Sequence, residues 1–187
     1  MMGFMREVAA LRASGGISRD ASLGAAVVAS FARHTAGRDL MACVLEVEGF
    51  EVRAAGRSMS VEDVVGMCLD PDVSALCYSV QATYDCPDVL RVDPLLREAG
   101  IRDRIVFNAG GSPVSRGFAE KACCDVYAPT AVASARAIAE AVRKRRGGRT
   151  RRQPEARPTG FTPHSGGCRV RSGAIAQDYS ASHDSRL

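Results

Sequence analysis

Apolar and polar positions alternate in blocks along the first 145 residues, and the blocks predict strands that alternate with helices. The runs GAAVVASF (24–31) and VSALCYSV (73–80) are short, continuously apolar and rich in small or β-branched residues, which is typical of strands buried on both faces. Between them, residues 38–48 repeat apolar positions at helical spacing. Ser60, with Asp63 three residues later, is a capping signal for another helix.

The rest of the pattern completes an alternating α/β arrangement. Further strands are predicted at 50–56, 104–109 and 125–127, and further helices at 4–13, 86–99 (broken near Pro94), 114–123 and 130–145. Five strands that alternate with helices imply right-handed crossovers and a parallel sheet covered on both faces. The predicted fold is therefore a flavodoxin-like (Rossmann-like), doubly wound, five-stranded parallel sheet with the strand order 2-1-3-4-5.

Charge and composition divide the chain into a folded part and a basic tail. From Arg143 to the end there are 11 Lys and Arg against 3 Asp and Glu, so the preceding part is net acidic. The tail is rich in Gly, Pro, Ser and Arg and buries too little apolar surface to offset its ordering entropy. We expect a short N-terminal helical segment (1–21), one folded domain (22–145) and a disordered basic tail (146–187), more often a solvated tail than an anion-binding one.

Several classes of protein are disfavoured. No apolar run reaches the about 20 residues that span a bilayer, and Arg6, Glu7 and Arg12 interrupt any signal-peptide core, so we expect a cytoplasmic protein without a membrane partner. The acidic domain argues against a specific nucleic-acid partner. The seven cysteines include no Cys-x-x-Cys spacing, so most are expected to be buried or inert thiols, with one reactive thiol as the alternative.

The unusual residues of the chain follow the predicted strands. His34 and Gly37 follow the first strand, Ser79, Gln81 and Thr83 the third, Gly110 and Gly111 the fourth, and Tyr127 and Ala128 the fifth. The carboxyl ends of parallel strands share one edge of the sheet, where ligands bind. A lone loop histidine is usually a solvated residue, and Gly-Gly is usually a tight turn. Their joint placement favours a narrow, uncharged binding slot beneath a histidine metal ligand.

Familiar catalytic motifs are missing from this edge. There is no acidic cluster of the phosphoacceptor type, no GxxxxGK[ST] and no GxGxxG after the first strand. No serine lies on a strand-to-helix elbow in the manner of hydrolases. No catalytic residue is therefore assigned.

Three motifs together resemble the cobalamin-binding domain of corrinoid proteins, whose signature is Asp-x-His-x-x-Gly, then Ser-x-Leu, then Gly-Gly. Here they are ARHTAG (32–37), SVQAT (79–83) and AGG (109–111). The stretch from 96 to 131, with GGSPV and VYAPTA, looks most like the corrinoid methyl carriers of methylamine and methanol methyltransferase systems, and the cobalamin module of methionine synthase is also similar. The resemblance covers about residues 22–142.

The resemblance implies a bound cobalamin (methylcobalamin or another corrinoid) in the base-off form, with His34 as the lower axial ligand of cobalt. Gly37 would let the loop approach the corrin, while Gly110 and Gly111 would give room to the displaced nucleotide tail. The other expected cofactor contacts are Ala32, Arg33, Thr35, Ser79, Gln81, Thr83, Tyr127, Ala128 and Ala131. Among these, Ser79 and Thr83 would line the tail channel.

The sequence departs from the family pattern in three places. Ala32 replaces the aspartate that hydrogen-bonds the histidine, a supporting role whose loss typically costs about 10–100-fold in affinity or activity. Gln81 replaces the leucine of Ser-x-Leu. The short segment 1–21 stands where methyl carriers have a helical bundle that caps the corrin, so it is interpreted as a remnant of that cap.

The implied function is that of a corrinoid protein that carries a methyl group on cobalt between separate methyltransferases. It would be a component of a methyltransferase system rather than a stand-alone enzyme, since the cofactor carries the chemistry. Two alternatives stay open: a degenerate cobalamin-binding-like domain that acts as a sensor or scaffold, and a cobalamin-binding subunit of a mutase.

Overall fold

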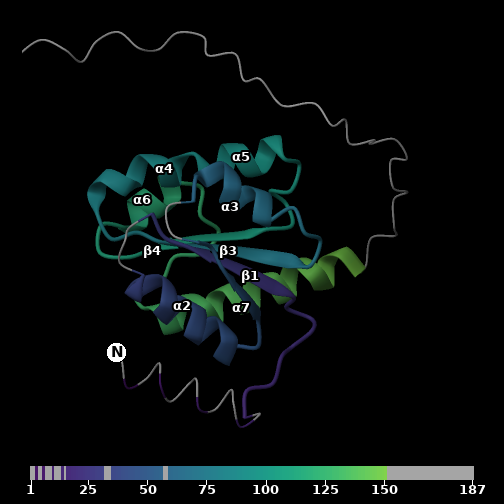
Figure 1. Ribbon diagram of the computed structural model, residues 1–187. Helices are drawn as coiled ribbons and strands as arrows, with labels where there is room; N and C mark the ends of the chain where they lie inside the picture. Colours follow the sequence, from purple (N-terminus) through teal and green to yellow (C-terminus); the bar gives the residue numbers. More distant parts are fainter. Residues whose placement is uncertain are drawn as a thin grey trace, which may run out of the picture. The chain divides into compact units, whose positions relative to one another are not determined.

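Four parallel strands form a single sheet with helices on both of its faces (Figure 1). The computed structural model describes residues 16–31, 35–56 and 59–150, together with the single positions 3, 6, 10 and 14. In chain order the elements are β1 (Ala25–Ala29), α2 (Ala36–Val47), β2 (Glu51–Ala54), α3 (Val61–Met67), β3 (Val73–Ser79), η1 (Thr83–Asp85), α4 (Cys86–Leu90), α5 (Val92–Glu98), β4 (Val106–Gly110), α6 (Arg116–Lys121) and α7 (Ala131–Thr150). The strand order is β2-β1-β3-β4.

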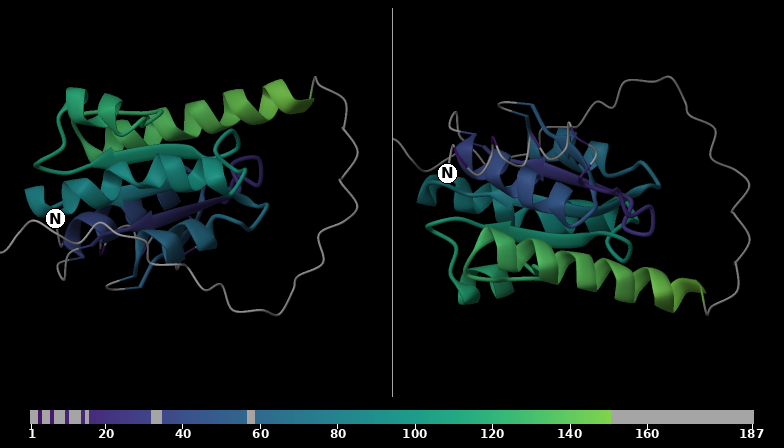
Figure 2. Two further views of the ribbon diagram at one scale, coloured as in Figure 1. Left: turned by 90° about the horizontal axis from the view of Figure 1, so that it is seen from above. Right: turned by 90° about the horizontal axis from the view of Figure 1, so that it is seen from below.

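The helices divide the core into two layers. Helices α3, α4, α5 and α6 cover one face of the sheet, and α2 and α7 cover the other (Figure 1). All five residues of β1 are buried, as expected for a central parallel strand. Helix α7 runs along the sheet on the β4 side, and its last turns extend past the ends of the other elements (Figure 2).

The predicted α/β class and the order of the first four strands are confirmed, but the fifth strand is wrong. Residues 125–127 make one parallel bridge, between Asn108 and Val126, and no strand. Side chains bind the adjoining backbone: Asp125 Oδ2 accepts from the N–H of Phe107 (2.7 Å), and Asn108 Nδ2 donates to the carbonyl oxygen of Val126 (2.9 Å). Pro129 then has no N–H with which to extend the ladder.

Helix boundaries differ from the prediction in two places. The break in 86–99 comes at Arg91, not at Pro94, because Pro94 lies in the first turn of α5, where a missing N–H costs nothing. Helix α7 continues to Thr150, beyond the predicted domain boundary at residue 145. The predicted tail beyond residue 150 and most of the predicted N-terminal helix lie outside the described residues.

The capping signal of α3 is confirmed. Ser60 Oγ accepts from the N–H of Asp63 (3.1 Å), and Asp63 Oδ2 accepts from the N–H of Ser60 (3.3 Å). The reciprocal pair satisfies two N–H groups that the first turn would otherwise leave without a partner.

A buried guanidinium joins α5 to the segment after α6. Arg102 donates to Asp93, to Asp125 Oδ2 (2.9 Å) and to the carbonyl oxygens of Ile105 (3.1 Å) and Cys123 (2.8 Å). Burial acts to raise the pKa of Asp93, but hydrogen bonds from Arg97 and Arg102 outweigh it and lower that pKa. The network fixes residues 123–126 against the edge of the sheet.

The cysteines of the described residues differ in exposure. Cys68 and Cys77 are buried and Cys123 is exposed. Burial raises the pKa of the Cys68 thiol to about 12 and raises that of Cys77 further. Within the described part of the chain, no group of three or more His, Cys, Asp or Glu residues could hold a metal ion, and no helix there is long and apolar enough to cross a bilayer.

Candidate functional site

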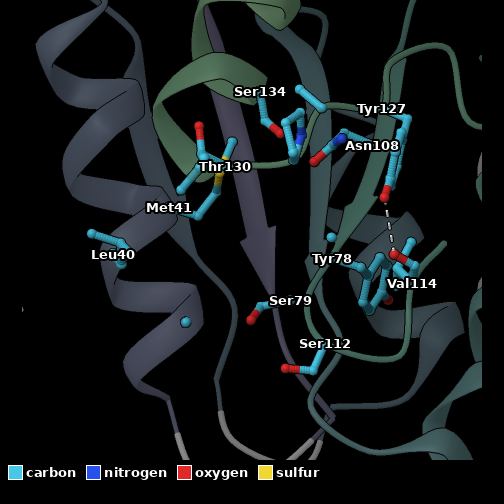
Figure 3. A pocket seen from close by; sticks show the side chains of 16 residues that line it. Leu40, Met41, Tyr78, Ser79, Asn108, Ser112, Val114, Tyr127, Thr130 and Ser134 are labelled. Carbon is cyan, nitrogen blue, oxygen red and sulfur yellow. Dashed lines mark hydrogen bonds between the residues drawn. The ribbon is translucent and has the colours of Figure 1, made fainter. Parts of the chain in front are cut away.

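A cavity of about 380 Å³ opens at the carboxyl edge of the sheet, between the strand ends and helices α2 and α7 (Figure 3). It is lined by Gly37, Leu40, Met41, Tyr78, Ser79, Asn108, Gly110, Gly111, Ser112, Val114, Tyr127, Ala128, Pro129, Thr130, Ala131 and Ser134. The volume falls within the range of about 300–1,000 Å³ that is usual for small-molecule sites. The position is the one at which open parallel sheets bind ligands.

Many of the residues predicted for a cofactor site surround this cavity. Those in its lining are Gly37, Ser79, Gly110, Gly111, Tyr127, Ala128 and Ala131. They come from α2, β3, β4, the loop after β4, the segment between α6 and α7, and the start of α7, so segments far apart in the sequence meet here. Their placement supports a binding site, while the role of each residue stays a prediction.

The remaining predicted residues lie elsewhere. Thr35 precedes α2, and its hydroxyl donates to Asp39 Oδ2 (2.7 Å), so it supports the first turn instead of lining the cavity. Gln81 and Thr83 follow β3 at the same edge but outside the lining. The predicted cobalt ligand and the two residues before it, positions 32–34, lie outside the described residues.

The two glycines of the AGG motif have different roles. A Cβ added at Gly110 would have no atom within 4 Å, so glycine there leaves open space in the cavity. Gly111 has φ +128°, and a Cβ there would lie 2.9 Å from the carbonyl carbon of Val80 and closer still to its oxygen. The backbone itself requires glycine at position 111. The backbone alone thus accounts for glycine at position 111, and its role in making room for a ligand stays a prediction.

The first turn of α2 lies directly against the end of β3. A Cβ on Gly37 would collide with Ser79 Oγ, so any other residue there would displace the Ser79 hydroxyl. The approach leaves the Ser79 hydroxyl between the helix and the cavity (Figure 3).

The inner part of the cavity contains polar residues that the sequence analysis missed. Asn108 in β4 is 2% exposed, and Ser134 in α7 is 5% exposed. An amide inside the apolar run RIVFNA, and hydroxyls four residues apart at Thr130 and Ser134, were signals that could have identified them. Leu40 and Met41 were missed because they look like ordinary core positions of an amphipathic helix.

One wall of the cavity is aromatic and fixed by its contacts. Tyr127 Oη donates to the carbonyl oxygen of Val114 (3.3 Å; Figure 3), and the guanidinium of Arg116 lies 5.4 Å from the centre of the Tyr127 ring. The ring of Tyr78 stacks on Phe31 at 4.7 Å between centroids, and burial raises its pKa.

Among the described residues that line the cavity, none has a carboxylate, an ammonium, a guanidinium or an imidazole side chain. The described lining thus offers hydroxyls, one amide, glycine backbone and apolar surface. It suits the binding of an elongated, mostly neutral organic group by shape and hydrogen bonds.

Buried polar atoms without a partner gather at this same edge. Among the described residues, Ser30 Oγ, Tyr78 Oη and Asp85 Oδ2 are enclosed and have no hydrogen-bond partner. Ser30 directly follows β1, Tyr78 lies next to the end of β3, and Asp85 ends η1. Such atoms typically cost about 1–3 kcal/mol each. Of these three residues, only Tyr78 belongs to the described lining of the cavity.

Comparison with known proteins gives relatives of one kind. No family model matches the chain. It is 32% identical over 112 residues to trimethylamine corrinoid protein 2 of Methanosarcina acetivorans, covering 59% of this chain and 51% of the relative. It is 30% identical over 98 residues to dimethylamine corrinoid protein 3 of the same organism, covering 52% and 46%. The chain spans about half the length of the curated relatives it matches.

Solved structures that match the chain are also corrinoid or cobalamin-binding proteins. The monomethylamine corrinoid protein of Methanosarcina barkeri matches with a TM-score of 0.59 and 25% identity, over 64% of this chain and 58% of that one. A cobalamin-binding protein of Desulfitobacterium hafniense matches in fold with a TM-score of 0.62 at 19% identity, over 73% and 69%. The predicted resemblance to the cobalamin-binding domain of corrinoid proteins is confirmed.

Proposed function

We propose that this chain, a relative of the methylamine corrinoid proteins, binds a corrinoid and carries a methyl group between separate methyltransferase proteins. The nucleotide tail of the corrinoid would enter the cavity, and His34 would bind cobalt from below. The bound corrinoid would supply the metal centre that accepts and releases the methyl group. The observation that carries the proposal is the cavity itself, because a chain with corrinoid-protein relatives has a slot at the sheet edge where that tail would have to enter.

The lining fits a nucleotide tail in shape and chemistry. Gly110 leaves open space at the end of β4, and Ser79 and Ser112 offer hydroxyls near the mouth (Figure 3). The first turns of α2 and α7 border the cavity, and the N-termini of helices favour a phosphate group. These residues would hold and orient the tail and exclude water from it.

The metal side of the proposal rests on sequence. His34 follows β1, whose carboxyl end lies at the same edge as the cavity. Ala32 stands where the family has its supporting aspartate, so the imidazole would lack that hydrogen bond. We therefore expect a weaker or less pH-sensitive axial bond than in a protein with the full motif.

Reconstitution of the full chain with hydroxocobalamin tests the proposal. After removal of free cofactor, we expect about one corrinoid to be retained per chain, with a visible spectrum in which an imidazole replaces the cofactor's own base. His34→Ala should keep some corrinoid but change the spectrum, and His164→Ala is the matched control that should not. If no corrinoid is retained, or if His34→Ala leaves the spectrum unchanged, the proposal is wrong.

One observation favours a second candidate, a degenerate domain that senses or scaffolds without turnover. Ala32 removes the carboxylate that couples ligation to protonation in the family. Such a protein would retain no corrinoid, or would retain one and transfer no methyl group to any methyltransferase partner. A methyl-transfer assay on the reconstituted chain separates the two candidates.

A further inference from the structure

The inner part of the cavity holds a hydrogen-bond acceptor that the described protein does not satisfy. Asn108 lies two residues before Gly110 along β4, which places its Cα about 6.6 Å deeper than the strand end. Its side chain faces the α2 and α7 side of the sheet, where Ser134 also lines the cavity (Figure 3).

The orientation of the Asn108 amide is fixed by chemistry. The carbonyl oxygen of Val126 can only accept a hydrogen bond, so the group 2.9 Å from it must be Nδ2. Oδ1 therefore points the other way, into the cavity (Figure 3). No described residue donates to Oδ1, and it is not among the fully enclosed atoms, so it opens onto the cavity space.

The tail of a corrinoid would reach this acceptor with its base. The base is the end of the nucleotide furthest from the corrin ring, so it would lie deepest when the tail enters from the mouth. A base edge with only methyl groups would remove Oδ1 from water and leave it without a donor. A site built around a buried polar group discriminates strongly against ligands that leave it unpaired.

We propose that Asn108, assisted by the hydroxyl of Ser134, makes the chain select corrinoids whose lower base carries an N–H or O–H donor. The inference rests on the proposed function and names the cofactor class of that same site. Hydroxybenzimidazole and aminopurine bases have such donors. 5,6-Dimethylbenzimidazole presents methyl groups on the corresponding edge.

The test compares equilibrium dissociation constants of the full chain for four probes. These are the 5-hydroxybenzimidazole, adenine and 5,6-dimethylbenzimidazole cobamides, and cobinamide, which has no nucleotide. We expect at least one donor-bearing cobamide to bind about tenfold or more tightly than the dimethylbenzimidazole form. Equal affinities for the three cobamides in the unmodified protein would overturn the inference without any variant.

Variants then test whether Asn108 causes the preference for donor-bearing cobamides. Asn108→Leu removes the acceptor at similar volume and should reduce the affinity ratio to near one. Ser79→Ala, at the mouth of the same cavity, should weaken all three cobamides alike and keep the ratio. A preference that persists in Asn108→Leu would overturn the assignment. If Asn108→Leu unfolds, as thermal melting of the apo form would show, Ser134→Ala takes its place and must lower the ratio.

The outcomes also separate this inference from the proposed function. If neither the cobamides nor cobinamide are retained, the proposed function fails and the inference fails with it. If all bind but without selectivity, the corrinoid site stands and only the selectivity is wrong.

Discussion

Replacing Gly111 by alanine should destabilise the apo protein, while the same change at Gly110 should not. Gly111 has φ +128°, and a Cβ there would collide with the backbone of Val80. A side chain forced into such a conformation costs about 1–3 kcal/mol. The obstacle is the carbonyl group of a chain segment tied to Gly110 by a 2.8 Å hydrogen bond from the Val80 N–H, so it cannot move without losing that bond.

Adding the strained conformation to a weakened hydrogen bond of about 1 kcal/mol gives a loss of about 3 kcal/mol for Gly111→Ala. For a protein of this size, each 1 kcal/mol lowers the melting temperature by about 2–4 °C. We therefore expect the melting temperature of Gly111→Ala to fall by about 6–12 °C. Gly110→Ala meets no atom within 4 Å and should melt within about 2 °C of the unmodified chain.

Calorimetry of the apo forms and cobalamin retention, measured on the same preparations, test the expectations for both variants. Gly110→Ala should narrow the cavity and weaken cofactor binding without unfolding the protein. Gly111→Ala should lose stability whether or not cofactor is added. A Gly111→Ala protein as stable as the unmodified chain would refute the backbone argument. A destabilised Gly110→Ala would show that the space beside that residue is not open.

Three further outcomes are expected. Ala32→Asp should restore a hydrogen bond to His34 and tighten cobalamin binding by about 10–100-fold in a titration, and equal or weaker affinity would mean that the loop does not have the family geometry. Arg102→Met removes a buried guanidinium, while Asp93 keeps Arg97 and Asp125 keeps Arg145, so it should lower the free energy of unfolding by about 2–3 kcal/mol in urea, whereas a loss below about 1 kcal/mol would contradict a structural role. The pKa of Asp93 is lowered in the fold from the unfolded value near 3.9, so its contribution to stability is full above about pH 5 and is lost as the pH falls through the folded pKa. Asp93→Asn should flatten that acid dependence in pH-dependent melting, and an unchanged slope would contradict the assignment.

The strands that the sequence predicted well are those in which burial on both faces leaves a continuous apolar run. A short run of small and β-branched residues, as in β1 and β3, is typical of a central parallel strand, and the structure places both strands at the centre of the sheet. The prediction of a strand at residues 125–127 was wrong because the outcome depended on contacts with residues far away in the sequence. Asp125 and Asn108 take up backbone groups that a fifth strand would have used, and no local pattern records that pairing.

Some residues of the candidate site could likewise be predicted from the sequence, and others could not. The loop positions at strand ends could be found from sequence because the carboxyl edge of a parallel sheet is where ligands bind. The polar residues in the inner part of the cavity, Asn108 and Ser134, could not be assigned to the site, because this requires knowing which faces of β4 and α7 lie toward one another. In the sequence, Asn108 is an isolated amide within an apolar run. The structure makes it a candidate ligand contact, because it lines the same cavity as Ser134.

Two segments that border the cavity are held in place by contacts with the rest of the fold, so the shape of the cavity is fixed on two sides. On one side, the close approach of Gly111 to Val80 fixes the loop after β4. On the other, Arg102 binds Asp125 and the backbone at Cys123, so the segment that leads into the Tyr127 wall is fixed as well. A cavity held in this way is formed before the ligand arrives, and preorganisation reduces the ordering cost of binding. Selectivity would then depend on a few side chains that project into a rigid slot, and changing them should alter which ligand binds without altering the fold.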